Sequence, residues 1–185
     1  MTTLVFRTCH AASASVWRMR YRPWLDAVLG YGIADHVLMV DDGSVMLPGW
    51  PDVGISSGDD VEDAIAPGGA ARVVLHHFVQ RLGRSDVIDF PGWHRSFVFA
   101  ARYAGRHGFE RVVHIESDAY VLTPRVASFL RAYRNGWCML WSKKYKSPEM
   151  ALQVVHGFIA AGAVGAVMLQ HEYRPLCAMP RIVVT

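Results

Sequence analysis

Residues 36–44, HVLMVDDGS, decide the fold class of this chain. The run HVLMV is typical of a buried strand, and the two aspartates, glycine and serine that follow are a turn signal that ends it. Upstream, residues 3–6 predict a first strand, and residues 11–30 predict a helix that Pro23 should kink or restart. Strand, helix and strand in this order form a βαβ unit, which implies parallel strands.

The same alternation continues downstream. A helix is predicted for residues 94–107, and the motif Thr123-Pro124 is typical of the start of another. Residues 43–70 are rich in glycine, proline and acids and predict a long loop. Ser147-Pro148 predicts one more helix start. Further strands are predicted at residues 72–75, 111–115 and 137–141. We therefore expect an α/β fold, with a mostly parallel, Rossmann-like sheet flanked by helices in a single domain.

Composition limits the class of protein. The chain has 185 residues, of which 52% are hydrophobic, so one domain with a sizeable core is expected. The net charge of +3 does not indicate a nucleic-acid partner, and three scattered cysteines do not indicate a disulfide framework. The start lacks the pattern of a secretory signal, and the longest apolar run, residues 157–169, is too short for a transmembrane segment. These features predict a cytoplasmic protein.

Charged residues follow the predicted strands. Arg7 comes after the first strand, Asp41 and Asp42 after the second, and Glu116 and Asp118 after residues 111–115. Ligands of open α/β sheets bind at the carboxyl ends of the strands, so these residues should face a ligand. Any one acid alone is better explained as the cap of a turn, but the set together favours a divalent metal, since Mg²⁺ and Mn²⁺ prefer hard oxygen ligands.

These segments resemble the GT-A-fold glycosyltransferases, and most nearly their family-2 type. HVLMVDDGS resembles the aspartate-bearing strand end of these enzymes, and RVVHIESDAYVLTPRV (111–126) resembles their DXD-type strand end, here as Glu116-Ser117-Asp118. PGWHRSFVFAARYAGRHGF (91–109) resembles the helix that precedes the metal motif. The resemblance covers residues 1–135. It implies a transferase that uses a nucleotide-diphospho-sugar donor and Mn²⁺ or Mg²⁺.

The resemblance also implies residue roles. Asp41 or Asp42 would contact the base or ribose of the donor, and Asp118 would hold the metal, with Glu116 binding it directly or through water. Arg95 would lie near the same edge. The implied substrate-binding set is Arg7, Asp41, Asp42, Arg95 and Ser117. Residues 1–118 would bind the nucleotide sugar, and residues 119–185 would form a short, or truncated, acceptor-side part.

An inverting enzyme needs a base that deprotonates the acceptor hydroxyl. After Asp118 the acids are Glu149, expected in the first turn of a helix, and Glu172, in unpatterned sequence. Glu149 is the predicted catalytic residue, and a retaining mechanism stays open. The acceptor, whether glycan, lipid or protein, is not indicated.

Two other classes of protein fit part of the pattern. The first is a catalytically silent GT-A-like domain that binds a nucleotide sugar or a protein, because only 67 residues follow Asp118. The second is a sugar-phosphate nucleotidyltransferase. That class is disfavoured, since RTCHAASAS (7–15) lacks the glycine-rich, basic loop expected after its first strand.

Overall fold

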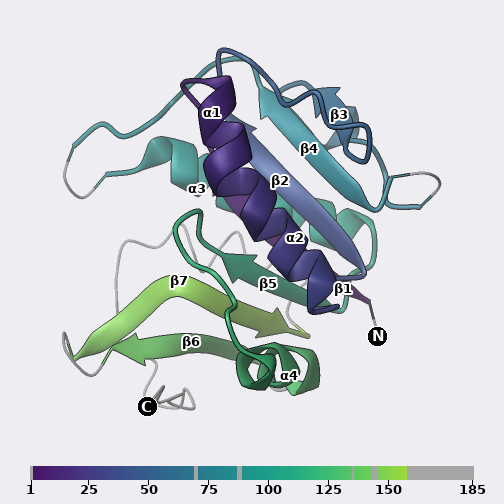
Figure 1. The fold of residues 1–185 in the computed structure, drawn as a ribbon, viewed down its shortest axis with the longest axis vertical. Coiled ribbons are helices and arrows are strands. Elements are labelled where there is room, and N and C mark those ends of the chain that lie inside the picture. The colour runs from purple at the N-terminus through teal and green to yellow at the C-terminus, as the bar shows by residue number, and fades with distance from the viewer. Residues whose placement is uncertain (1, 69–70, 87–88, 135, 143–145, 158–185) are drawn as a thin grey trace.

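The computed structural model describes residues 2–157 except 69–70, 87–88, 135 and 143–145. These residues form an α/β domain around a seven-stranded sheet with the strand order β3-β4-β2-β1-β5-β7-β6 (Figure 1). The strands are β1 (Thr3–Cys9), β2 (His36–Asp42), β3 (Gly54–Ser57), β4 (Val73–Phe78), β5 (Arg111–Ile115), β6 (Trp137–Ser142) and β7 (Ser147–His156).

Most of the sheet is parallel. β1 pairs in parallel with β2 and β5, and β4 pairs in parallel with β2 and β3. β7 is antiparallel to both β5 and β6 and extends the sheet on one side. The predicted fold class, a mostly parallel α/β sheet flanked by helices, is confirmed.

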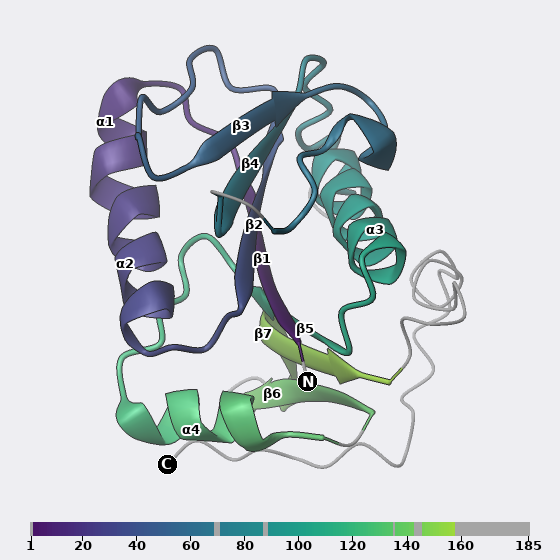
Figure 2. The same cartoon turned by 90° about the vertical axis from the view of Figure 1, so that its right-hand side faces the viewer.

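Helices cover both faces of the sheet. The α-helices are α1 (Ala14–Val16), α2 (Arg22–Gly30), α3 (Pro91–Arg106) and α4 (Pro124–Ala132), and a π-helical segment, η1 (Trp17–Tyr21), joins α1 to α2. Figure 2 shows α1, α2 and α4 on one face and α3 on the other. Among the described residues, no helix is long and apolar enough to cross a bilayer.

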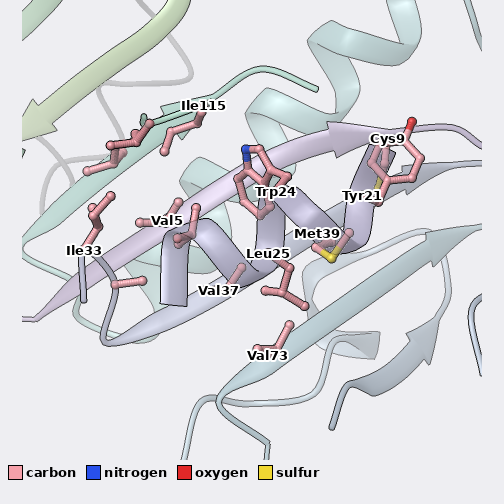
Figure 3. Close-up of a cluster of buried hydrophobic side chains, with 14 of the residues drawn as sticks. Val5, Cys9, Tyr21, Trp24, Leu25, Ile33, Val37, Met39, Val73 and Ile115 are labelled. Atoms are coloured by element: carbon pink, nitrogen blue, oxygen red, sulfur yellow. The ribbon is translucent and has the colours of Figure 1, made fainter. Parts of the chain in front are cut away.

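The alternation of side chains along β1 separates two cores. Val5 and Cys9 pack with Trp24 beneath α1–α2 (Figure 3), whereas Leu4 and Phe6 face α3. Each face of the strand is buried, which explains why apolar residues occupy both faces of β1 and do not alternate with polar ones.

Local signals set the ends of several helices. Pro23 cannot donate a backbone hydrogen bond, and the π-helical segment lies directly before α2, where the sequence predicts a kink or restart. Thr123 caps α4 as predicted, since its Oγ1 accepts a hydrogen bond from the Val126 backbone N–H at 3.3 Å.

Three expectations need correction. Residues 43–70 are not loop throughout, because Gly54–Ser57 form the edge strand β3 and Val61–Asp63 form a 3-10 turn, η2. β1 continues through Cys9, so Arg7 lies within the strand and not after it. The helix predicted at Ser147-Pro148 is wrong, since this segment begins β7 and pairs with β6. Pairing with neighbouring strands overrides the local helix-start signal.

Candidate functional site

The carboxyl ends of β1, β2, β4 and β5 meet at one edge of the sheet. From β1 the chain adds β2 on one side and later β5 on the other, so the direction of strand addition reverses between β1 and β5. Ligands of open α/β sheets bind in the crevice outside the strands at such a switch point. The edge between the ends of β2 and β5 is therefore the candidate site.

Asp41 is enclosed at this edge. Its side chain has no exposed surface, and its Oδ2 accepts hydrogen bonds from the Ser44 backbone N–H at 2.9 Å and from His77 Nδ1 at 2.7 Å. Its Oδ1 accepts a hydrogen bond from the Ser44 hydroxyl at 2.5 Å. The same hydroxyl oxygen accepts a hydrogen bond from the Ala11 N–H. Asp41 thus ties the ends of β1, β2 and β4 together.

Asp42 faces the opposite side of the sheet, toward α3. Its carboxylate accepts hydrogen bonds from Arg95 Nη2 at 2.5 Å and from the backbone N–H groups of Leu82 and Gly83 at 3.2 and 2.7 Å. A Cβ on Gly92 would lie 2.3 Å from Asp42 Oδ2, so only glycine allows the start of α3 to approach the carboxylate this closely. Arg95 therefore lies at the predicted edge, paired with Asp42.

Arg95 is further fixed by two contacts. Its guanidinium lies 4.0 Å from the centroid of the Phe78 ring, and its Nη2 also donates to the Gln80 carbonyl at 2.6 Å. A cation held over an aromatic face and against a carboxylate loses little mobility when a ligand binds.

The segment after β5 presents its carboxylates differently. Glu116 is half-buried, and its carbonyl accepts a hydrogen bond from the Ala119 N–H, which closes a turn. Asp118 is exposed, and no described residue makes a hydrogen bond or ion pair with its carboxylate. Ser117 between them is held by Arg20, whose Nε and Nη2 donate to its carbonyl and hydroxyl oxygens, each at 2.9 Å.

The donor set can be compared with the needs of a divalent ion. Among the described residues, no group of three or more His, Cys, Asp or Glu side chains is placed to hold a metal. Asp41 and Asp42 do not fit as ligands, because their oxygens accept hydrogen bonds from protein groups. Glu116 and Asp118 fit the usual mode of Mg²⁺ or Mn²⁺ beside phosphates, which takes one or two carboxylates from the protein.

Glu149 lies in β7, three residues beyond the last residue of β7 that pairs with β5. Ile115 of β5 pairs with Leu152 of β7, and the Glu116 N–H donates to the Ala151 carbonyl at 2.8 Å. Because β7 is antiparallel to β5, Glu149 lies beyond Ala151, on the side of the segment that carries Glu116 and Asp118. The alternative base, Glu172, lies outside the described residues.

Arg7 lies in the core below this edge and has no exposed surface. Its guanidinium is placed between the rings of Tyr21 and Trp24, with 4.4 Å from Cζ to each centroid, and both rings point toward β1 (Figure 3). Burial lowers the pKa of Arg7 to about 10. The predicted contact with substrate is thus blocked in this conformation, and its role stays a prediction.

Two residues of the site were missed from the sequence. His77 contacts Asp41 because Asp41 and His77 are paired residues of β2 and β4, a register that no local motif reveals. Arg20 reaches Ser117 across 97 positions of sequence. The adjacent pair His76-His77 was a usable signal, since neighbouring strand residues point to opposite faces. His76 accordingly contacts Ser56 Oγ and the Gly58 carbonyl instead.

No family model matches the chain, and no curated protein is significantly similar to it. Among solved structures, the chain is similar to a protein of Desulfovibrio desulfuricans G20 that is provisionally named a nucleotide-diphospho-sugar transferase, with a TM-score of 0.39 and 12% identity. The overlap covers 85% of this chain and 64% of that one, so the chain spans less than two thirds of the length of that protein. A similarity this low supports no conclusion about activity.

Proposed function

We propose that this chain is a metal-dependent glycosyltransferase that uses a nucleotide-diphospho-sugar as donor. The observation that supports the proposal is the exposed carboxylate of Asp118 directly after β5, beside the switch point of the sheet. A ligand in that crevice would lie between Asp118 on one side and the ordered Asp42–Arg95 pair on the other. The acceptor is not specified by the proposal.

Glu116 and Asp118 would hold Mn²⁺ or Mg²⁺ at the diphosphate of the donor. A divalent ion bound there would neutralise negative charge on the departing nucleoside diphosphate. The turn that the Ala119 N–H closes would hold the backbone between Glu116 and Asp118 in place.

The nucleoside of the donor would lie over the ends of β2 and β4. Asp41 is enclosed, so its influence would pass through His77, whose side chain is 15% exposed and is oriented by the carboxylate. Asp42 would act in the same way through Arg95, whose side chain is 21% exposed. The two aspartates of HVLMVDDGS would then position the residues that contact the nucleoside.

Glu149 would serve as the general base of an inverting reaction, accepting the proton of the acceptor hydroxyl. The hydrogen bond from the Glu116 N–H to the Ala151 carbonyl supports this role, because it joins β7 to the segment that carries Asp118 two residues before Glu149 is reached. A base must lie within hydrogen-bond reach of the acceptor hydroxyl, and the pairing of Glu149 with Leu140 of β6 places it on a strand and not on a loop.

A second candidate is a domain that binds a nucleotide sugar without transferring it. The internal engagement of Asp41 and Asp42 favours this candidate, because their oxygens already accept hydrogen bonds from protein groups. Slow hydrolysis of the bound donor separates the candidates, since a transferase active site cleaves the donor with water as acceptor and a silent domain does not.

The first prediction tests donor binding. UDP- and GDP-sugars are titrated with Mn²⁺ while the melting temperature is followed, and at least one donor should raise it. Asp118→Asn should abolish the metal-dependent shift and leave the melting temperature of the free protein unchanged, because the side chain is exposed. Asp59→Asn, at an exposed aspartate after β3, is the matched control and should bind like the unmodified protein. Metal-dependent binding that survives Asp118→Asn would refute the metal assignment.

A further inference from the structure

Arg7 is a cation without a counter-ion. All three nitrogens of its guanidinium are buried and have no hydrogen-bond partner among the described residues. No carboxylate oxygen of the described residues therefore lies within hydrogen-bond distance of the guanidinium. Buried charges in proteins are normally paired, because removing an ion from water is costly unless another charge compensates it.

Stacking compensates only part of this cost. Two cation–π contacts at 4.4 Å stabilise the guanidinium, but they leave five N–H donors unsatisfied. Burial lowers the pKa of Arg7 to about 10, so the side chain keeps its charge at neutral pH. A buried and charged arginine that lacks a partner calls for an anion.

A second cation lies beside Arg7. Arg20 acts on Arg7 as a like charge, and its own guanidinium donates to the carbonyl and hydroxyl oxygens of Ser117. The Tyr120 hydroxyl donates to the Arg20 carbonyl at 2.9 Å. The segment that contains Ser117 and Tyr120 is therefore held against Arg20 by three hydrogen bonds.

Those hydrogen bonds resemble what a phosphate group would offer. Arg20 uses a forked pair of N–H donors, Nε and Nη2, on two oxygens of Ser117, and the same fork matches two oxygens of a phosphate. An incoming phosphate could replace the Ser117 oxygens, release the segment 116–122 and reach Arg7 beneath it.

We propose that Arg7 and Arg20 form an anion subsite for the diphosphate group of the ligand, covered in this structure by residues 116–122. The identity of the anion rests on the proposed function, because the subsite adjoins Glu116 and Asp118. Binding replaces the two contacts to Ser117 with contacts to phosphate oxygens and gives Arg7 its counter-ion. The two cations then neutralise negative charge that the carboxylates of the β5 end cannot.

Stability distinguishes this role from a structural one. If Arg7 is retained for an anion, replacing it with an apolar side chain of similar length removes an uncompensated charge, and the ligand-free protein becomes more stable. If Arg7 is instead a structural stacking residue, the same replacement loses two cation–π contacts and destabilises the fold. Arg7→Met should therefore raise the melting temperature of the free protein by about 2–4 °C.

The experiment measures binding of inorganic diphosphate by calorimetry in the presence of EDTA, so that no metal and no nucleoside contribute. The unmodified full chain should bind, and Arg7→Met and Arg20→Gln should each weaken binding by about tenfold or more, the scale of a lost charge-assisted hydrogen bond. Arg18→Gln, at an exposed arginine two residues before Arg20, is the matched control and should bind normally. If Arg7→Met does not fold, Arg7→Lys replaces it and should show the same loss, because lysine lacks the planar fork.

Two results would overturn the subsite. One is unmodified protein that does not bind diphosphate. The other is an Arg7 or Arg20 variant that binds it as tightly as the Arg18→Gln control. Neither result touches the proposed function, which is tested with intact donors and Mn²⁺. Conversely, diphosphate binding that depends on both arginines, in a protein that binds no nucleotide sugar, would keep the subsite and refute the glycosyltransferase.

Discussion

Asp41 and Asp42 at the end of β2 are enclosed, whereas Asp118 after β5 is exposed, although both segments reach the same edge of the sheet. The two aspartates of β2 accept hydrogen bonds from loops and from neighbouring elements, and so they hold the edge together. Asp118 has no such partner among the described residues. The aspartates at this edge thus divide into two enclosed residues with protein partners and one exposed residue. This division follows from the contacts of each side chain and not from the motif that contains it.

The largest effect on stability should come from replacing an enclosed aspartate at the end of β2. Asp42→Ala removes the partner of Arg95 and leaves the N–H groups of Leu82 and Gly83 unsatisfied. The free energy of unfolding should fall by about 3 kcal/mol, the scale for breaking a buried pair. Urea denaturation measures it. Asp118→Ala is the control and should change it by less than about 0.5 kcal/mol. Equal losses in both variants would show that the two ends do not differ.

The next largest effect concerns the rate of sugar transfer and the role of Glu149 at the β5 side of the edge. If Glu149 is the base, Glu149→Gln should lower the rate of sugar transfer by roughly 10²-fold or more and leave donor affinity nearly unchanged. Initial rates and donor titrations on the same preparation measure both quantities. Glu62→Gln, at an exposed acid of η2, is the control. Transfer at the unmodified rate would assign the base elsewhere or favour a retaining mechanism.

His36, at the opposite end of β2, extends the structural role of this strand to a pH dependence. Burial, assisted by the nearby His107, lowers the pKa of His36 to about 4 from an ordinary 6.5. Between these values the unfolded chain takes up a proton that the folded chain refuses, so stability should fall as the pH drops from 6.5 to 4.

The expected loss is about 2 kcal/mol, less than the full shift would give, because the folded protein already begins to take up the proton at pH 4.5. Unfolding free energies measured at pH 7 and pH 4.5 test it. His36→Gln should flatten the dependence, whereas His94→Gln, at an exposed histidine, should leave it unchanged. If the free energy of unfolding of His36→Gln depends on pH as strongly as that of the unmodified protein, the pH dependence does not come from His36.

The fold was largely predictable because most strands are marked by local composition. Residues 36–40 and 111–115 are buried on both faces and mostly apolar, as is typical of strands between two helical layers. β3 was missed because GISS is short and polar for a strand, and it is held at the edge of the sheet by pairing with β4. Ser147-Pro148-Glu149 carries a helix-start signal, but pairing with β6 prevails there.

The site was predictable only in outline. The rule of the carboxyl ends located Asp41, Asp42 and Asp118 at one edge, since it needs only the order of strands. Which of them is enclosed depends on contacts such as Asp41–His77 and Asp42–Gly83, between residues about 40 positions apart. Strand register and loop packing determine those contacts, and neither can be predicted from a local sequence motif.

The smallest effect concerns Ser117, which lies between the two carboxylates of the β5 side. Ser117→Ala removes one of the two hydrogen bonds from Arg20, the one to the hydroxyl, and leaves the one to the carbonyl. Because the residue is half-buried and Arg20 can turn to water, the free energy of unfolding should fall by only about 1 kcal/mol. If the hydroxyl instead contacts the donor directly, donor affinity should fall as well. Measuring both quantities on one variant separates the possibilities: a loss of stability alone makes Ser117 a support of the segment 116–122, and a loss of affinity at unchanged stability makes it a donor ligand.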